Sequence, residues 1–134
     1  MKTYLLYEIA NSCAGSTKLI LKLIDSLPKE DPVRSSRASG PERTRALGAS
    51  ATSNGMGVKF QAYKYNEIAL KDYEWYSVYK QTFIKPQNWK KIFLHAKEKG
   101  FDVWIDVFDM YSVQIIKDNL SLITGIKLQS SVLD

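Results

Sequence analysis

Residues 86–108 read PQNWKKIFLHAKEKGFDVWIDVF and predict a helix followed by a strand. Pro86 suits the first position of a helix, where its missing N–H loses no hydrogen bond, and Gly100 suits the residue just after a helix. Between them, apolar side chains at helical spacing form one stripe. The stripe consists of Trp89, Ile92, Phe93 and Ala96. The short apolar run FDVWIDVF at 101–108 then predicts a strand.

The same alternation of strand and helix continues on both sides of this unit. The further elements we expect are a strand at 3–10, a helix after Ser16 or Thr17, a strand at 58–63, a tyrosine-rich helix at 67–82, a helix at 111–122 and a strand opening at 125–128. The inward residues of the first and last of these helices are predicted to be Leu19, Ile20, Leu23, Ile24 and Leu27, and Val113, Ile116 and Leu120. Strands that alternate with helices favour right-handed βαβ units and a parallel sheet.

Four such units amount to half of a (β/α)8 barrel, which typically needs about 250 residues. The predicted fold class is therefore α/β, the first half of a TIM-type barrel with parallel strands and a flexible insertion. Residues 1–134 would form this partial barrel, since 134 residues leave room for one domain.

Composition excludes several classes of protein. Apolar residues make up 45% and aromatics 12%, enough for a core, and no run approaches the roughly 18 apolar residues of a membrane helix. One cysteine cannot form an internal disulfide, and one cysteine with one histidine cannot form a zinc finger. Glu8 interrupts the apolar start of the chain, which argues against a signal peptide. We expect a soluble, reduced, cytoplasmic protein.

Residues 33–57, VRSSRASGPERTRALGASATSNGMG, differ in composition from their surroundings. They hold all four arginines and one glutamate, but no lysine, isoleucine or aromatic residue, whereas the flanking chain is rich in all three. Such a segment buries too little apolar surface to offset its ordering entropy, so we predict a disordered or non-native insertion. Three interpretations stay open: a surface insertion, a basic arm that binds a polyanion, and a segment foreign to this gene.

Polar side chains interrupt the predicted strands near their C-terminal ends. They are Glu8 in the first strand, Lys59 and Gln61 in the second, Asp106 in the third, and Lys127, Gln129 and Ser130 at the fourth. In an α/β barrel these ends form the mouth of the active site. A lysine inside a buried strand is costly unless it is paired or binds an anion. Lys59 and Lys127 therefore indicate either a site for a small anion, or ion pairs with Glu8 or Asp106, or an exposed strand edge.

Four blocks of sequence then resemble the N-acetylneuraminate (sialic acid) synthases and their relatives. The blocks are YEIANSCAG at 7–15, GVKFQAYK at 57–64, WIDVFDMYSV at 104–113 and GIKLQSSVLD at 125–134. The resemblance implies a (β/α)8 barrel, usually followed by an antifreeze-like domain. It implies an enzyme that condenses phosphoenolpyruvate with N-acetylmannosamine or a related sugar and releases phosphate. A divalent metal, manganese or magnesium, would assist.

The resemblance also implies roles for individual residues. Lys59 and Gln61 of the VKFQ block would bind phosphoenolpyruvate, and Lys127 and Ser130 of the KLQS block would bind its phosphate or carboxylate. Glu8 would be the catalytic carboxylate, facing the sugar and a metal-bound water.

The chain departs from the family pattern in three ways. Cys13 stands where the family usually has a histidine, and we interpret it as a small, partly buried residue. The metal-binding histidines of the family lie in the second half of its barrel, so no metal ligand is expected in this chain, and His95 falls on a helix away from the strand ends. The insertion at 33–57 occupies a loop that is short in the family.

These departures lead us to expect an incomplete fragment without synthase activity of its own. The alternative is a non-catalytic half-barrel module that binds phosphoenolpyruvate or a sugar acid. We expect small-molecule substrates and neither nucleic acid nor membrane as partners, and the resemblance leaves a homodimer open. Aromatic residues at 73–83 could form a stacking platform, but we predict that they pack a helix against the sheet. They are Tyr73, Trp75, Tyr76, Tyr79 and Phe83.

Overall fold

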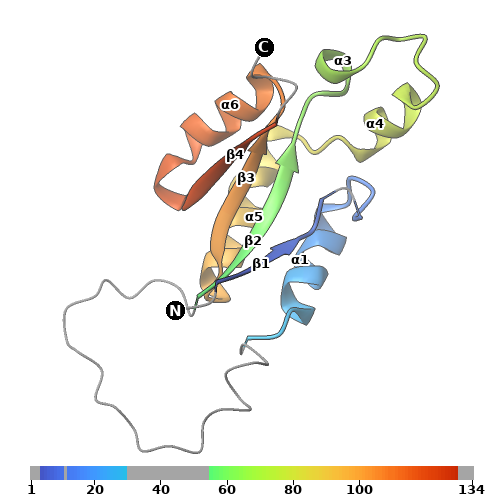
Figure 1. Ribbon diagram of the computed structural model, residues 1–134. Helices are drawn as coiled ribbons and strands as arrows, with labels where there is room; N and C mark the ends of the chain where they lie inside the picture. The colour runs from blue at the N-terminus through green and yellow to red at the C-terminus, as the bar shows by residue number, and fades with distance from the viewer. Residues whose placement is uncertain (1–3, 11, 30–54, 130–134) are drawn as a thin grey trace, which may run out of the picture.

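The computed structural model describes residues 4–10, 12–29 and 55–129. Its four strands form one parallel sheet in the order β1-β2-β3-β4, so the predicted α/β class is confirmed (Figure 1). The strands are β1 (Leu5–Glu8), β2 (Met56–Ala62), β3 (Asp102–Val107) and β4 (Gly125–Leu128). The helices are α1 (Thr17–Ser26), α3 (Tyr65–Ile68), α4 (Tyr76–Thr82), α5 (Pro86–Glu98) and α6 (Met110–Asp118), followed by the short 3-10 helix η1 (Leu120–Leu122).

The two faces of this sheet differ in chemistry. Partners in the register of parallel strands point to the same face, and alternate residues of each strand point to opposite faces. One face therefore carries β2 and β3 residues that belong to the hydrophobic core with α1, α5 and α6: Val58, Phe60, Ala62, Val103 and Ile105. We call it the apolar face. The opposite face carries Lys59 and Gln61 of β2 beside Trp104 and Asp106 of β3, and we call it the polar face.

Helix α5 forms as its sequence predicts. Pro86 occupies its first turn, and the four residues of the predicted stripe are all buried. Gly100 follows the helix with φ of +87°, a left-handed conformation that glycine adopts without steric cost. The packing of α5 against the sheet therefore forms the centre of the hydrophobic core.

Helix α1 packs as predicted except at Leu19, since Leu23 and Leu27 are partly buried against the core. Ser16 caps it by accepting a hydrogen bond from the Leu19 amide, and only Ile20 and Ile24 are buried within it. Leu19, predicted to face inward, is 39% exposed.

The inward face of α6 agrees with the prediction at Ile116, which is partly buried against the core, but it also includes residues that were not predicted. Asp109 caps the helix by accepting from the Ser112 amide, and the Ser112 hydroxyl accepts from the amides of Phe108 and Asp109. This reciprocal capping turns Ser112 and Ile115 toward the sheet, where both are buried. Leu120, predicted to point inward, lies in η1 and is 68% exposed.

The single helix predicted over 67–82 is wrong. The structure has two short helices there, α3 and α4, and no residue of either is buried. Between them the chain turns, with the Tyr73 amide donating to the Leu70 carbonyl and the Tyr76 amide to the Tyr73 carbonyl. A helix gains most of its stability from packing an apolar face, and this segment packs none into the core.

Strand β2 begins two residues earlier than expected. Met56 and Gly57, assigned by composition to the insertion at 33–57, belong to β2, and Met56 is buried in the core. Residues 33–54 of that predicted insertion lie outside the described residues. Within the described part of the chain, none of the helices has the length and apolar character required to cross a membrane.

Candidate functional site

Five side chains meet at the carboxyl ends of the strands on the polar face. They are Glu8, Lys59, Gln61, Asp106 and Gln129, and we call them the strand-end cluster. The Lys59 Nζ lies 3.0 Å from Glu8 Oε1 and 3.4 Å from Asp106 Oδ2. Register explains the meeting, because Glu8 is the partner of Lys59 and Gln61 is the partner of Asp106.

Lys59 remains a charged group despite its burial. Its side chain is only 8% exposed, and desolvation by itself would lower its pKa. The hydrogen bond to Glu8 and the nearby charge of Asp106 act in the opposite direction and leave the pKa above that of a free lysine. The strand-end cluster therefore holds a charged ammonium group in a fixed position on the polar face.

Asp106 is the buried centre of the cluster. It is fully buried, and its Oδ2 accepts from Gln129 at 3.1 Å and from Gln61 at 3.5 Å in addition to its ion pair with Lys59. Its Oδ1 is buried and has no hydrogen-bond partner among the described residues. A buried carboxylate oxygen without a donor is energetically costly, so this atom is a natural acceptor for a further group.

Glu8 occupies the water-facing side of the cluster. Its side chain is 48% exposed, while one of its oxygens accepts from Gln61 at 3.3 Å and pairs with Lys59. A carboxylate in this position can turn toward solvent or toward a bound hydroxyl without leaving a buried charge behind.

The structure does not bring every predicted site residue into the cluster. Lys127 is the register partner of Asp106 on the edge strand β4, but it is exposed and makes no ion pair with the described residues. Ser130 lies outside the described residues. Glu8, Lys59 and Gln61 do come together, and their roles in binding stay predictions.

Two members of the cluster were noticed in the sequence but not named as binding residues, although Asp106 was weighed there as an ion-pair partner of a lysine. Asp106 and Gln129 are polar residues at strand ends, one on each side of the β3–β4 pairing. The signal that could have assigned them is register: Asp106 lies opposite Gln61, so a second carboxylate had to approach Lys59 from the far side.

The loops after the first three strands are tied to one another near this site. The Asp109 carboxylate that caps α6 also accepts from the Lys64 amide at 2.7 Å. Gly15 has φ of +73°, and a Cβ there would lie 2.4 Å from the Gln81 carbonyl oxygen, so the loop after β1 packs directly on the end of α4. The edge of the site is therefore formed by several segments of the chain that contact one another.

Cys13 lies in the loop after β1 and is buried. It belongs to the hydrophobic core cluster, and burial raises the pKa of its thiol. A thiol in this setting is a small core residue rather than a reactive group, which supports our interpretation from the sequence.

The opposite end of the polar face is filled by aromatic and polar side chains. The Trp104 Nε1 donates to the Tyr4 hydroxyl at 3.0 Å, and that hydroxyl donates to Asp102 at 2.8 Å. The Trp104 ring lies over Gly57 and Gly125 of the neighbouring strands, where a Cβ would come within 3.0 Å and 2.5 Å of it respectively. This end of the face is therefore filled by the packing of Trp104, and the strand-end cluster lies at the other end.

The aromatic residues of 73–83 do not pack one helix against the sheet as predicted, although Tyr79 meets the buried Tyr63 ring edge-on and Phe83 contacts Tyr111. Tyr73 is 46% exposed and Trp75 is 52% exposed. Several of the rings instead contact one another on the α3–α4 segment: Tyr73 stacks on Tyr79, and Tyr65 meets both Tyr76 and Phe83 edge-on. The reason is that α3 and α4 lie past the end of β2, where no helix-covered sheet face is available.

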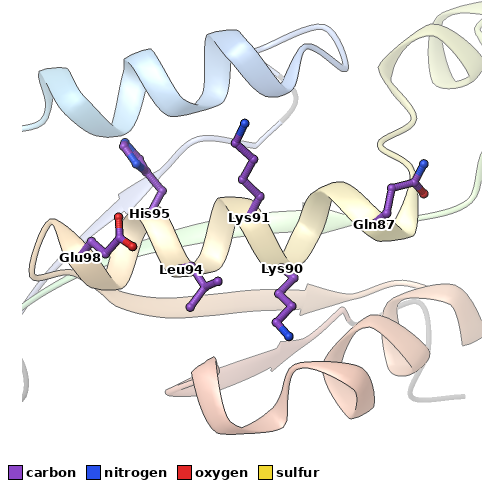
Figure 2. A pocket seen from close by; sticks show the side chains of 6 residues that line it. All are labelled: Gln87, Lys90, Lys91, Leu94, His95 and Glu98. Atoms are coloured by element: carbon purple, nitrogen blue, oxygen red, sulfur yellow. The ribbon is translucent and has the colours of Figure 1, made fainter.

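A shallow hollow lies along the outer side of α5, away from the strand ends. Figure 2 shows its lining residues pointing to both sides of the helix: Gln87, Lys90, Lys91, Leu94, His95 and Glu98. His95 Nε2 lies 3.0 Å from the Asp25 carboxylate of α1. This histidine therefore links two helices and is remote from the strand-end cluster, as its place in the sequence predicts.

The described residues do not fit the divalent metal that the resemblance implies. No three histidine, cysteine, aspartate or glutamate side chains among them are grouped closely enough to hold an ion. Glu8 and Asp106 do approach each other, but both are paired with Lys59, which repels a cation.

Two solved structures have a fold similar to that of this chain. The chain is similar over 97% of its length to a protein assigned as spore coat polysaccharide biosynthesis protein E from Chromobacterium violaceum, with a TM-score of 0.66 and 20% identity. It is similar over 96% of its length to an N-acetylneuraminic acid (sialic acid) synthetase from Leptospira borgpetersenii, solved in complex with citrate, with a TM-score of 0.65 and 16% identity. The chain therefore shares the fold of the region of the synthetase to which it aligns.

The parallel α/β arrangement agrees with the resemblance in sequence. The chain spans 34% of the length of the first structure and 36% of the second. By sequence alone, neither a protein-family model nor a curated protein matches it.

Proposed function

We propose that the chain is the first half of a sialic acid synthase-like (β/α)8 barrel whose strand-end cluster binds phosphoenolpyruvate. The observation that carries this proposal is Lys59, a buried and charged lysine of β2 whose ammonium group lies among side chains from the carboxyl ends of parallel strands. Ligands of α/β barrels bind at these ends. The fold likeness to a sialic acid synthetase supports the same assignment.

The chemistry of the cluster suits an anionic substrate with a hydroxylated partner. The Lys59 ammonium, with Lys127 from the neighbouring strand, would neutralise the phosphate and carboxylate of phosphoenolpyruvate, and Gln61 would donate a hydrogen bond. Glu8, half exposed beside them, would orient a sugar hydroxyl or a water molecule. The acceptor would be N-acetylmannosamine or a related sugar.

The expected manganese or magnesium ion takes no part in this assignment. The described residues do not fit it, so we assign no step to it. We propose instead that this chain supplies the binding of phosphoenolpyruvate and does not complete the condensation alone.

Calorimetry tests the binding. Phosphoenolpyruvate is titrated into the wild-type chain, Lys59→Gln and Lys91→Gln at one ionic strength. Lys59→Gln keeps a donor for the two carboxylates, and Lys91→Gln makes the same charge change on the outer side of α5. We expect Lys59→Gln to weaken binding at least about tenfold, as loss of a charge-assisted contact should, and Lys91→Gln to leave it within about twofold.

Equal affinity of all three proteins, or no binding by the wild type, would refute the site. A phosphate-release assay with N-acetylmannosamine, with and without Mn²⁺, tests the second part. Release of phosphate by the chain alone would show that it is an active synthase rather than the binding half of one. Binding without release would agree both with a synthase fragment and with a non-catalytic half-barrel module. Repeating the assay after adding the second half of such a barrel distinguishes them, because only a synthase fragment should then release phosphate.

A further inference from the structure

The strand-end cluster carries the wrong net charge for an anion site as it stands. Lys59 contributes one positive charge, and Glu8 and Asp106 contribute two negative charges within 3.4 Å of it. An approaching phosphate or carboxylate therefore meets a net negative group, and the repulsion is strong where water is excluded. For an anion to bind at Lys59, the charges must first rearrange.

The two carboxylates differ in their freedom to do so. Glu8 has a half-exposed side chain and can turn into water. Asp106 is fully buried near the carboxyl end of β3 and cannot leave its position. A second cation is therefore required beside Asp106 before Lys59 can be shared with a ligand.

Lys127 is placed to supply that cation. It is the register partner of Asp106 on β4, so its side chain leaves the sheet on the same face. Adjacent strands lie about 4.8 Å apart, a distance that a lysine side chain spans. Asp106 Oδ1, the oxygen without a donor among the described residues, remains available to it.

We propose that Asp106 is a positioning residue that holds Lys59 when no ligand is bound and releases it by pairing with Lys127 when an anion enters. The Lys127 ammonium has three donors and can bridge Asp106 Oδ1 and the ligand. The site thus selects ligands with two anionic groups, because a ligand must engage both lysines to displace the internal carboxylate. This inference rests on the anion site proposed above.

A double-mutant cycle tests it, with phosphoenolpyruvate titrated into four forms of the full chain. They are the wild type, Asp106→Asn, Lys127→Met and the double variant. Lys127→Met should weaken binding about tenfold, because Asp106 then stays paired to Lys59. Adding Asp106→Asn removes that competing charge and should recover about half of the loss on a logarithmic scale, because the direct contact of Lys127 with the ligand stays lost.

A purely structural Asp106 gives a different result, namely a double variant that binds as weakly as Lys127→Met or more weakly. That outcome overturns the inference and leaves the anion site standing. Failure of the wild type to bind refutes the proposed function itself, and with it the exchange.

A second readout needs no ligand. NMR titration of the lysine ε-carbons follows the pKa of Lys59 in the wild type, Asp106→Asn and the exposed control Asp118→Asn. Asp106→Asn should lower the Lys59 pKa, since the opposite charge of Asp106 helps to raise it. The control should leave it unchanged. An equal Lys59 pKa in all three proteins would show that Asp106 does not hold Lys59, and circular dichroism confirms that each variant is folded.

Discussion

The two faces of the sheet follow opposite rules of composition. On the apolar face, Val58, Phe60 and Ile105 are at most 2% exposed and pack against the helices. On the polar face, Lys59 and Asp106 occupy the same two strands at alternate positions and are almost as well buried. Strands of a parallel sheet are usually apolar on both sides, so the polar face departs from the pattern that stability alone would favour.

The apolar face stabilises the fold, whereas the polar face holds the charged groups of the candidate site. Apolar burial stabilises in proportion to area, whereas a buried ion pair offsets a large desolvation cost and often adds little net stability. A cluster of this kind at strand ends is therefore better explained by function than by folding. The predictions below compare the two faces directly.

The largest effect is expected on the apolar face. Phe60 is buried and contacts the rings of Trp89 and Phe93, so Phe60→Ala should lower the free energy of unfolding by about 3–5 kcal/mol. Leu6→Ala is the control on the polar face, where Leu6 is 38% exposed, and should lower it by about 1 kcal/mol. Urea denaturation measures both, and equal losses would contradict the division between the faces.

A smaller loss is expected when the charge balance of the polar face is broken. Lys59→Met leaves Asp106 buried without a cation and should lower the free energy of unfolding by about 3 kcal/mol. Adding Asp106→Asn removes the uncompensated charge, so the double variant should recover most of that loss. A double variant less stable than Lys59→Met in urea would show that Asp106 stabilises the fold by something other than its pairing with Lys59.

The end of the polar face that Trp104 fills should respond to a single methyl group. Gly125→Ala places a Cβ 2.5 Å from the Trp104 ring, which must move, and about 1–3 kcal/mol of stability should be lost. Tryptophan fluorescence should change with it. Introduced into a Trp104→Leu background, the same substitution should cost much less, and an equal cost in both backgrounds would mean that the ring is not what the methyl group meets.

Alkaline pH should lower the free energy of unfolding through two groups on the polar face. Burial is the main cause that raises the pKa of Tyr4 to about 12, and the adjacent Asp102 contributes. The native chain therefore keeps a proton that the unfolded chain loses near pH 10, so stability should fall as pH rises from about 10 to 12. The raised pKa of Lys59 acts in the same direction. Tyr4→Phe should flatten the decline in urea midpoints measured from pH 9 to 12, and an unchanged slope would exclude Tyr4 as its source.

Regular elements of the fold were predictable from sequence because local signals decided them. Helix α5 has a proline at its start, a glycine after its end and an apolar stripe between, and all three are confirmed. The segment 67–82 lacks such a stripe directed at the core, and there the periodicity of aromatic residues was misleading. In α6 the apolar spacing indicated Ile116 correctly, but the capping by Asp109 and Ser112 also turned Ser112 and Ile115 inward, which spacing did not indicate.

The candidate site was predictable only in part, because its geometry depends on register between strands. Polar residues at strand ends located Glu8, Lys59 and Gln61 correctly at one place. No local pattern reveals which carboxylate sits opposite which lysine, so the central position of Asp106 emerged from the structure alone. The alternative left open in the sequence, that Lys59 pairs with Glu8 or Asp106, is what the structure has, and it pairs with both.

The smallest effect on stability is expected at Lys127, and it bears most closely on the comparison. Lys59 and Lys127 lie on the same face, but Lys59 is buried between two carboxylates and Lys127 is exposed on the edge strand. Lys127→Met should therefore change the free energy of unfolding by no more than about 0.5 kcal/mol in urea. Its effect should appear only when phosphoenolpyruvate is present, as a smaller rise in melting temperature than the wild type shows. A large loss of stability without ligand would mean that Lys127 already pairs with Asp106, in which case the polar face would be charge-balanced before any substrate arrives.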